Sequence, residues 1–267
     1  SLCYNKPGAA QCAAADIAKH NWEAAMRAKT NRTRILVLVL LGAAVGLILR
    51  RWQLAAAYDE AGMILPGSVS TWVVSIFSAA AAAALAIGVL RLPKRGEYEE
   101  CFSSGRPEMV ISVAAAVLVV LGCGLELMRG PTAVRLLVGF LGIASGLCFA
   151  VTAMQRYNGT IPRPAIHLLP CVYLVLQLIV DFKQWSVDPA IQDYCYDLFA
   201  AIAAMCAVFH LGGFCVGYGR RRLATFWCLA CVIFSAISLT DGTLGRGLLV
   251  GGLGLWTGIN AWQLLEE

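Results

Sequence analysis

The sequence predicts an all-α protein, a polytopic transmembrane helical bundle of about eight spans. Hydrophobic residues make up 59% of the 267-residue chain, and charged residues make up only 14%. A soluble domain carries roughly 25% charged residues, so this chain has too few to cover a water-exposed surface. Apolar surface on this scale is stable in lipid, and the apolar residues gather in long runs.

Eight apolar runs approach or reach the length that a helix needs to cross the hydrocarbon core. The first loses its apolar character at Arg50 and Arg51, whose long side chains can reach the interface. The fifth contains Pro170 near its start, which leaves a kinked or half-spanning helix as an alternative. The predicted spans are 35–57, 71–90, 110–128, 134–154, 165–180, 198–216, 223–239 and 247–265.

The basic residues predict the orientation independently of the span search. When eight spans alternate from a cytoplasmic N-terminus, fifteen of the twenty-one Lys and Arg residues fall inside and six fall outside. Cytoplasmic loops carry an excess of Lys and Arg, so this arrangement follows the positive-inside rule. Only the pair Arg50 and Arg51 clearly departs from it. We therefore expect both termini to be cytoplasmic.

The chain divides into an N-terminal segment, residues 1–33, and a transmembrane domain, residues 34–267. The first segment has helical composition, with Lys19, Arg27 and Lys29 among apolar residues such as Trp22, and no signal-peptide core. It is expected to be a solvated cytoplasmic helix, or a basic interfacial helix that lies on anionic lipid. Nucleic-acid binding is not expected, because the basic residues are few and topology accounts for them.

Two glycine-rich stretches resemble each other, Leu136–Gly146 in the fourth span and Leu248–Gly258 in the eighth. The similarity predicts a parallel repeat of four plus four spans, with chance likeness of Leu/Gly-rich helices as the alternative. Small residues four apart let helix backbones approach closely, within the chain or in a homo-oligomer. The residues expected to pack helices in this way are Gly142, Gly146, Gly254 and Gly258.

Four ionisable residues are candidates for contact with a transported solute, because charge within a membrane is costly. His210 lies deep in the sixth span, where it relays protons or contacts solute, or else forms a neutral hydrogen bond to a neighbouring helix. Glu126, Asp181 and Asp197 lie at the outer ends of spans and could form an acidic vestibule that concentrates cations. The alternative for these three acids is ordinary polarity at helix ends.

The stretch from His167 to Arg222 contains Asp-Pro-Ala-Ile-Gln-Asp-Tyr-Cys-Tyr-Asp-Leu-Phe-Ala, followed later by Gly-Tyr-Gly-Arg-Arg-Arg. It resembles a family of uncharacterised multi-pass membrane proteins from anaerobic Gram-positive bacteria. The resemblance covers a minor part of the chain. It implies a bacterial plasma membrane, and no activity is attached to the family.

The sequence favours a small-solute transporter or permease that resides in the lipid bilayer of the plasma membrane. A non-transport sensor, assembly factor or scaffold is the alternative, because deep polar residues are scarce. An enzyme is not expected, since the sequence has no phosphate-binding loop, nucleophile elbow or zinc-protease motif. No cofactor and no metal are expected either, because His and acidic residues do not cluster.

Overall fold

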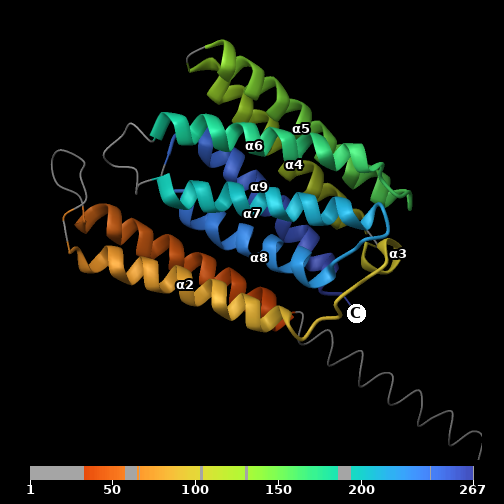
Figure 1. The fold of residues 1–267 in the computed structure, drawn as a ribbon, viewed down its shortest axis with the longest axis horizontal. Helices are drawn as coiled ribbons and strands as arrows, with labels where there is room; N and C mark the ends of the chain where they lie inside the picture. Colours follow the sequence, from red (N-terminus) through yellow and green to blue (C-terminus); the bar gives the residue numbers. More distant parts are fainter. Residues whose placement is uncertain are drawn as a thin grey trace, which may run out of the picture.

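The computed structural model of the chain describes residues 33–57, 65, 67–102, 105–129, 132–185, 194–240 and 242–266. Every regular element in these ranges is a helix (Figure 1). The N-terminal segment predicted over 1–33 lies, apart from Thr33, outside the described residues. The helices are Thr33–Ala56, α2 (Val69–Val89), α3 (Tyr98–Cys101), α4 (Arg106–Met128), α5 (Ala133–Tyr157), α6 (Pro164–Trp185), α7 (Cys195–Phe214), α8 (Arg221–Ser238) and α9 (Leu244–Leu264).

The eight long helices coincide with the eight predicted spans, with ends that differ by a few residues. Helix α4 begins four residues before the predicted start, with Pro107 in its first turn, where its missing N–H is harmless. Helix α6 runs through Pro170 as one helix of 22 residues, so the half-spanning alternative does not apply. The short helix α3 lies between the second and third predicted spans, where the sequence predicts no span.

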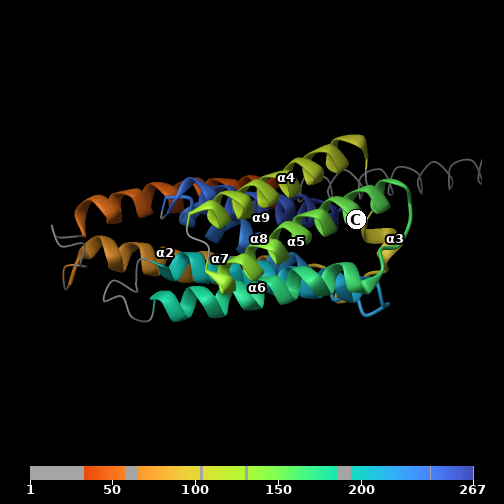
Figure 2. The ribbon, with the colours of Figure 1, turned by 90° about the horizontal axis from the view of Figure 1, so that it is seen from above.

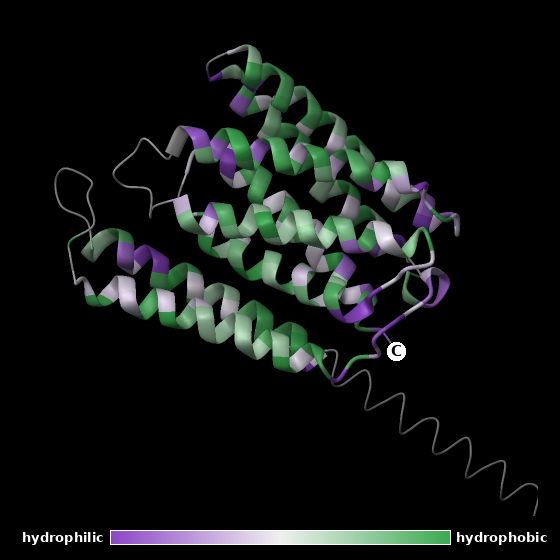
Figure 3. Ribbon diagram, viewed as in Figure 1, coloured by the Kyte–Doolittle hydropathy of each residue, from purple (hydrophilic) through white to green (hydrophobic). Residues whose placement is uncertain are grey.

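Seven of the long helices are long and apolar enough to cross a membrane, and α9 is the exception. Helix α9 buries Trp256, Asn260 and Gln263 against its neighbours. A helix enclosed by other helices needs no lipid-compatible surface, so its hydropathy is lower than that of its neighbours. Apolar residues dominate the lengths of the helices in Figure 3. The protein is therefore an integral, multi-pass membrane protein.

Helix α9 lies within the bundle, with α4, α7 and α8 packed against it (Figures 1 and 2). Helix α9 packs most extensively on α4 and also on α8, which in turn packs on α7. In the most apolar stretch of α8, 61% of the residues are buried, against 17% in the corresponding stretch of α2. The hairpin of Thr33–Ala56 and α2 is thus peripheral, and α2 contacts the rest of the bundle mainly through α8.

Helices α4 and α9 approach each other at backbone distance. A Cβ atom on Gly122 would lie 2.5 Å from the backbone nitrogen of Leu249. A Cβ atom on Gly252 would lie 2.9 Å from the carbonyl oxygen of Ala115. Only glycine permits so close an approach, because any side chain would force the two backbones apart.

The four predicted packing glycines all face other helices of the same chain. A Cβ atom on Gly142 would lie 2.4 Å from the Cys123 sulfur of α4, and one on Gly146 would lie 2.6 Å from Val120. A Cβ atom on Gly254 would lie 2.8 Å from the Ser235 side chain of α8. Gly258 faces Val232 of α8 at an ordinary van der Waals distance. These glycines therefore serve contacts within the chain.

The packing agrees with the four-plus-four repeat at one pair of helices and differs from it at another. Such a repeat pairs α2 with α7 and α4 with α8. Helix α4 packs extensively on α5, as α8 does on α9. Helix α7 also packs extensively on α8, whereas its equivalent pair, α2 with α4, has at most a weak contact. The repeat therefore stays a prediction, with a shared need of α5 and α9 for a thin surface that accepts a neighbour as the alternative.

Candidate functional site

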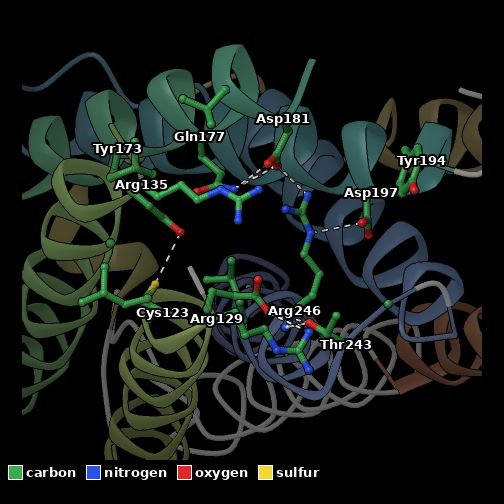
Figure 4. Close-up of a pocket in the computed structure, with 17 residues that line it drawn as sticks. Cys123, Arg129, Arg135, Tyr173, Gln177, Asp181, Tyr194, Asp197, Thr243 and Arg246 are labelled. Carbon is green, nitrogen blue, oxygen red and sulfur yellow. Dashed lines mark hydrogen bonds and ion pairs between the residues drawn. The ribbon is translucent and has the colours of Figure 1, made fainter. Parts of the chain in front are cut away.

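A cavity of about 330 Å3 opens at one end of the bundle, and we call it the Arg246 pocket (Figure 4). Residues of α4, α5, α6, α7 and α9 line it, together with the connection before α9. The ionisable residues among them are Glu126, Arg129, Arg135, Asp181, Asp197 and Arg246, along with Tyr173, Tyr194 and Cys123.

Arg246 joins three helices through two ion pairs. Its Nη2 lies 2.7 Å from Oδ2 of Asp181 on α6, and its Nε lies 3.1 Å from Oδ2 of Asp197 on α7. The side chains are 14% exposed for Arg246, 10% for Asp181 and 2% for Asp197. In Figure 4 the two carboxylates approach the guanidinium from different helices. Because little water screens these ion pairs, they fix the relative positions of α6, α7 and α9.

Hydrogen bonds from uncharged side chains hold both carboxylates in place. The amide of Gln177 donates to both oxygens of Asp181, at 2.9 Å each. The hydroxyl of Ser238 on α8 donates to Asp197. Gln177 lies one turn before Asp181 on α6, so the sequence spacing itself brings the amide to the carboxylate.

The start of α9 positions Arg246. Thr243 is the N-cap, and its hydroxyl accepts from the backbone N–H of Arg246 at 3.3 Å. The same hydroxyl donates to Glu126 on α4, so the cap also ties α9 to α4. Arg129 lies 3.8 Å from Glu126 at the mouth, where both side chains are substantially exposed.

The three predicted acids do line one pocket, but they share it with three arginines. Glu126, Asp181 and Asp197 face Arg129, Arg135 and Arg246. The charges balance among the described lining residues, so this lining does not form the purely acidic vestibule expected from the sequence. Further acids of the predicted outer loops, namely Asp59, Glu60, Asp188, Asp193 and Asp241, lie outside the described residues. The pocket is suited to a ligand with charges of both signs.

His210 lies apart from the Arg246 pocket. It is half-buried and lines a groove of about 650 Å3 between α6 and α7, together with His167 and Arg220. Its ring contacts that of Phe209, with centroids 5.5 Å apart. The structure therefore brings together three of the four predicted polar residues and leaves His210 in a different place.

A second buried arginine, Arg156 of α5, lies toward the opposite end of the bundle. Its Nε donates to the Tyr98 hydroxyl at 3.2 Å, and its Nη1 donates to the side-chain oxygens of Asn260 and of Gln263, the latter at 3.2 Å. Its guanidinium lies 4.1 Å from the ring centroid of Phe102. We call these five residues the Arg156 cluster. Burial raises the pKa of the Tyr98 hydroxyl, so this partner stays neutral.

Sequence reasoning missed Arg246 and Arg156, because each lies just outside a predicted span. Arg246 directly precedes the predicted eighth span, and Arg156 follows the fourth. Arg50, expected to reach toward the interface, is instead fully buried, with Nη1 donating to Gln53 at 2.8 Å and its guanidinium 5.1 Å from the Tyr196 ring. A charged residue beside a span and in phase with its buried face is the signal that identifies such residues.

The described residues contain no group of three or more His, Cys, Asp or Glu arranged to hold a metal ion. The functional hypothesis therefore depends on the geometry of the Arg246 pocket. Comparisons with protein-family models, with curated proteins and with solved structures found no match.

Proposed function

We propose that the protein is a transporter of small zwitterionic solutes and that the Arg246 pocket is its binding site. The observation that carries the proposal is the largely buried Arg246, held between carboxylates of two other helices at the wall of a cavity. Transporters commonly bind their substrates where several helices contribute polar groups around a cavity. A volume of about 330 Å3 lies at the small end of the range for ligand pockets, which suits a solute of amino-acid size.

The ion pairs supply a way to couple solute binding to helix movement. A solute ammonium group can replace Arg246 at Asp181, and a solute carboxylate can bind the released guanidinium. Each replacement loosens the connection of α9 to α6 or α7. A ligand shifts a conformational equilibrium only by its differential affinity for the two states, and this exchange of partners provides such a difference.

The location proposed for the protein is a bacterial plasma membrane, with α9 as the eighth span. The excess of Lys and Arg in alternate loops supports cytoplasmic termini, and the resemblance over residues 167–222 supports the bacterial membrane. In this orientation the Arg246 pocket opens to the outside. The first helix begins and α9 ends at the same end of the bundle, as an even number of spans requires (Figure 1).

A non-transport receptor is the alternative, and the α4–α9 interface favours it. The backbone contacts at Gly122 and Gly252 leave no space for a solute between these two helices. In a receptor, the solute would bind in the Arg246 pocket and would not cross the membrane.

Proteoliposomes distinguish the two functions. We would purify the chain, reconstitute it, and measure uptake of a mixture of radiolabelled amino acids, with empty liposomes as the blank. Arg246→Gln and Asp181→Asn should each reduce uptake, because each removes a charged group of the pocket. Arg163→Gln, an exposed residue outside the pocket, is the matched control.

The outcomes separate clearly. Uptake that falls in the two pocket variants and persists in the control supports the transporter. Saturable amino-acid binding without uptake would support the receptor and not the transporter. If folded wild-type protein neither binds nor takes up any amino acid, the proposal of a zwitterion site is overturned.

A further inference from the structure

A second hollow, at the Arg156 end of the bundle, lies between the end of α2 and the start of α8. It has a volume of about 530 Å3, and we call it the basic groove. Its apolar wall consists of Ala86, Val89, Leu90, Leu223 and Phe226. Its remaining lining residues are all cationic, namely Lys94, Arg95, Arg220 and Arg222.

Two hydrogen bonds, one between backbones and one from a side chain to a backbone carbonyl, bring these distant segments together. The backbone N–H of Gly96 donates to the carbonyl of Gly219 at 3.4 Å, and the Arg222 guanidinium donates to the Leu92 carbonyl. A Cβ atom on Gly219 would lie 2.5 Å from the Gly96 carbonyl oxygen, so this approach requires glycine. The connection after α2 is thereby held beside the connection before α8, and four cations collect at one place.

The charge of the basic groove is unbalanced, in contrast to the Arg246 pocket. No carboxylate is among its described lining residues. Lys94, Arg95 and Arg220 are exposed, so their charged groups are accessible to a ligand. Four like charges around one hollow repel each other, and a bound anion relieves that repulsion.

We propose that the basic groove binds an anionic phospholipid, with the phosphate at the four cations and an acyl chain along the apolar wall. The wall is made by two helices apolar enough to span the membrane, and Leu90 is 63% exposed on it. A free phosphate would contact only the cationic part and would leave this apolar surface uncovered. Basic pockets between transmembrane helices on the cytoplasmic side suit anionic headgroups, because that leaflet is rich in anionic lipid.

The test measures thermal unfolding of the full chain in detergent during titration with phosphatidylglycerol, phosphatidylcholine, or inorganic phosphate. Phosphatidylglycerol should raise the Tm well above the value reached with phosphatidylcholine, and inorganic phosphate should not. Lys94→Gln combined with Arg95→Gln should weaken the apparent affinity for phosphatidylglycerol roughly tenfold or more. Both residues are exposed, so the fold should tolerate the change.

The matched control is Arg91→Gln combined with Arg163→Gln, which removes the same charge from exposed residues outside the groove. This control should keep the wild-type response. An equal loss in both double variants would show diffuse attraction to the basic surface and overturn the proposal. A comparable rise with inorganic phosphate would also overturn it, because a soluble anion would then suffice. The single variant Arg220→Gln is a second test of the same site and should also weaken the apparent affinity for phosphatidylglycerol.

Discussion

Arg246 and Arg156 are both buried arginines near opposite ends of the bundle, yet their partners differ in charge. Arg246 contacts two carboxylates and faces a cavity. Among the described residues, the partners of Arg156 are a hydroxyl, two amide oxygens and an aromatic ring, all of them neutral. The first arrangement can exchange partners with a charged solute, whereas the second offers no carboxylate to exchange. Substrate contact is therefore better placed at Arg246, and a structural role at Arg156.

The two sites also respond differently to loss of their arginine. Without Arg246, two buried carboxylates of like charge remain close together. Without Arg156, the remaining groups are dipoles that can find other partners or water. A buried charge that loses its counter-charge is costly, whereas a neutral group that loses one hydrogen bond is less so.

The largest effect is expected for Arg246→Leu. It removes the guanidinium that lies between Asp181 and Asp197, so the free energy of unfolding should fall by about 3–5 kcal/mol, measured by SDS-induced unfolding in mixed micelles. Arg129→Leu is the matched control, because Arg129 is 48% exposed, and it should change stability by less than about 0.5 kcal/mol. Equal losses in the two variants would mean that the Arg246 ion pairs do not stabilise the fold.

Removal of the carboxylates should be non-additive. Asp181→Asn leaves Arg246 paired one to one with Asp197, so we expect a loss of about 1 kcal/mol. The double variant Asp181→Asn with Asp197→Asn removes both carboxylates that pair with the Arg246 guanidinium and should cost about 3–5 kcal/mol. The same unfolding assay on both single variants and the double variant measures the coupling. Strict additivity would contradict the shared ion-pair arrangement.

A smaller effect is expected for Arg156→Met, which preserves the length of the side chain and removes its charge. The hydroxyl of Tyr98 and the amides of Asn260 and Gln263 lose a donor, so stability should fall by about 1–3 kcal/mol. Amino-acid uptake should be retained in the folded fraction of this variant. A loss as large as that of Arg246→Leu would remove the energetic distinction between the two ends.

Hydropathy predicted the helices well because the bilayer fixes both the length and the polarity of a span. Its weakest prediction concerned helix faces, since the sequence does not say which side of a helix meets protein. Helix α9 illustrates this. Its buried Asn260 and Gln263 lower its hydropathy, and only the structure shows that α4 and α8 cover it.

The candidate site was predicted in part, for a physical reason that is visible at α9. The rule that charge in a membrane is costly selected Glu126, Asp181 and Asp197, and all three line the Arg246 pocket. The rule did not identify Arg246, because the predicted span begins at Gly247, whereas the helix begins at Leu244. Since the helix begins three residues earlier than predicted, Arg246 belongs to its first turn and not to a solvated loop. The depth rule also selected His210, but depth alone does not say which groove a side chain lines.

The orientation of the two ends is tested by labelling. Met128, beside the Arg246 pocket, is 83% exposed, and Tyr218, in the connection before α8, is 82% exposed, so cysteine should be tolerated at both. A membrane-impermeant maleimide should label Met128→Cys in intact cells and Tyr218→Cys only after permeabilisation, because Arg220, Arg221 and Arg222 favour the cytoplasm. The parent chain gives the background from native cysteines. Labelling of both variants from one side would break the alternation of spans and with it the assignment of the two buried arginines to opposite faces of the membrane.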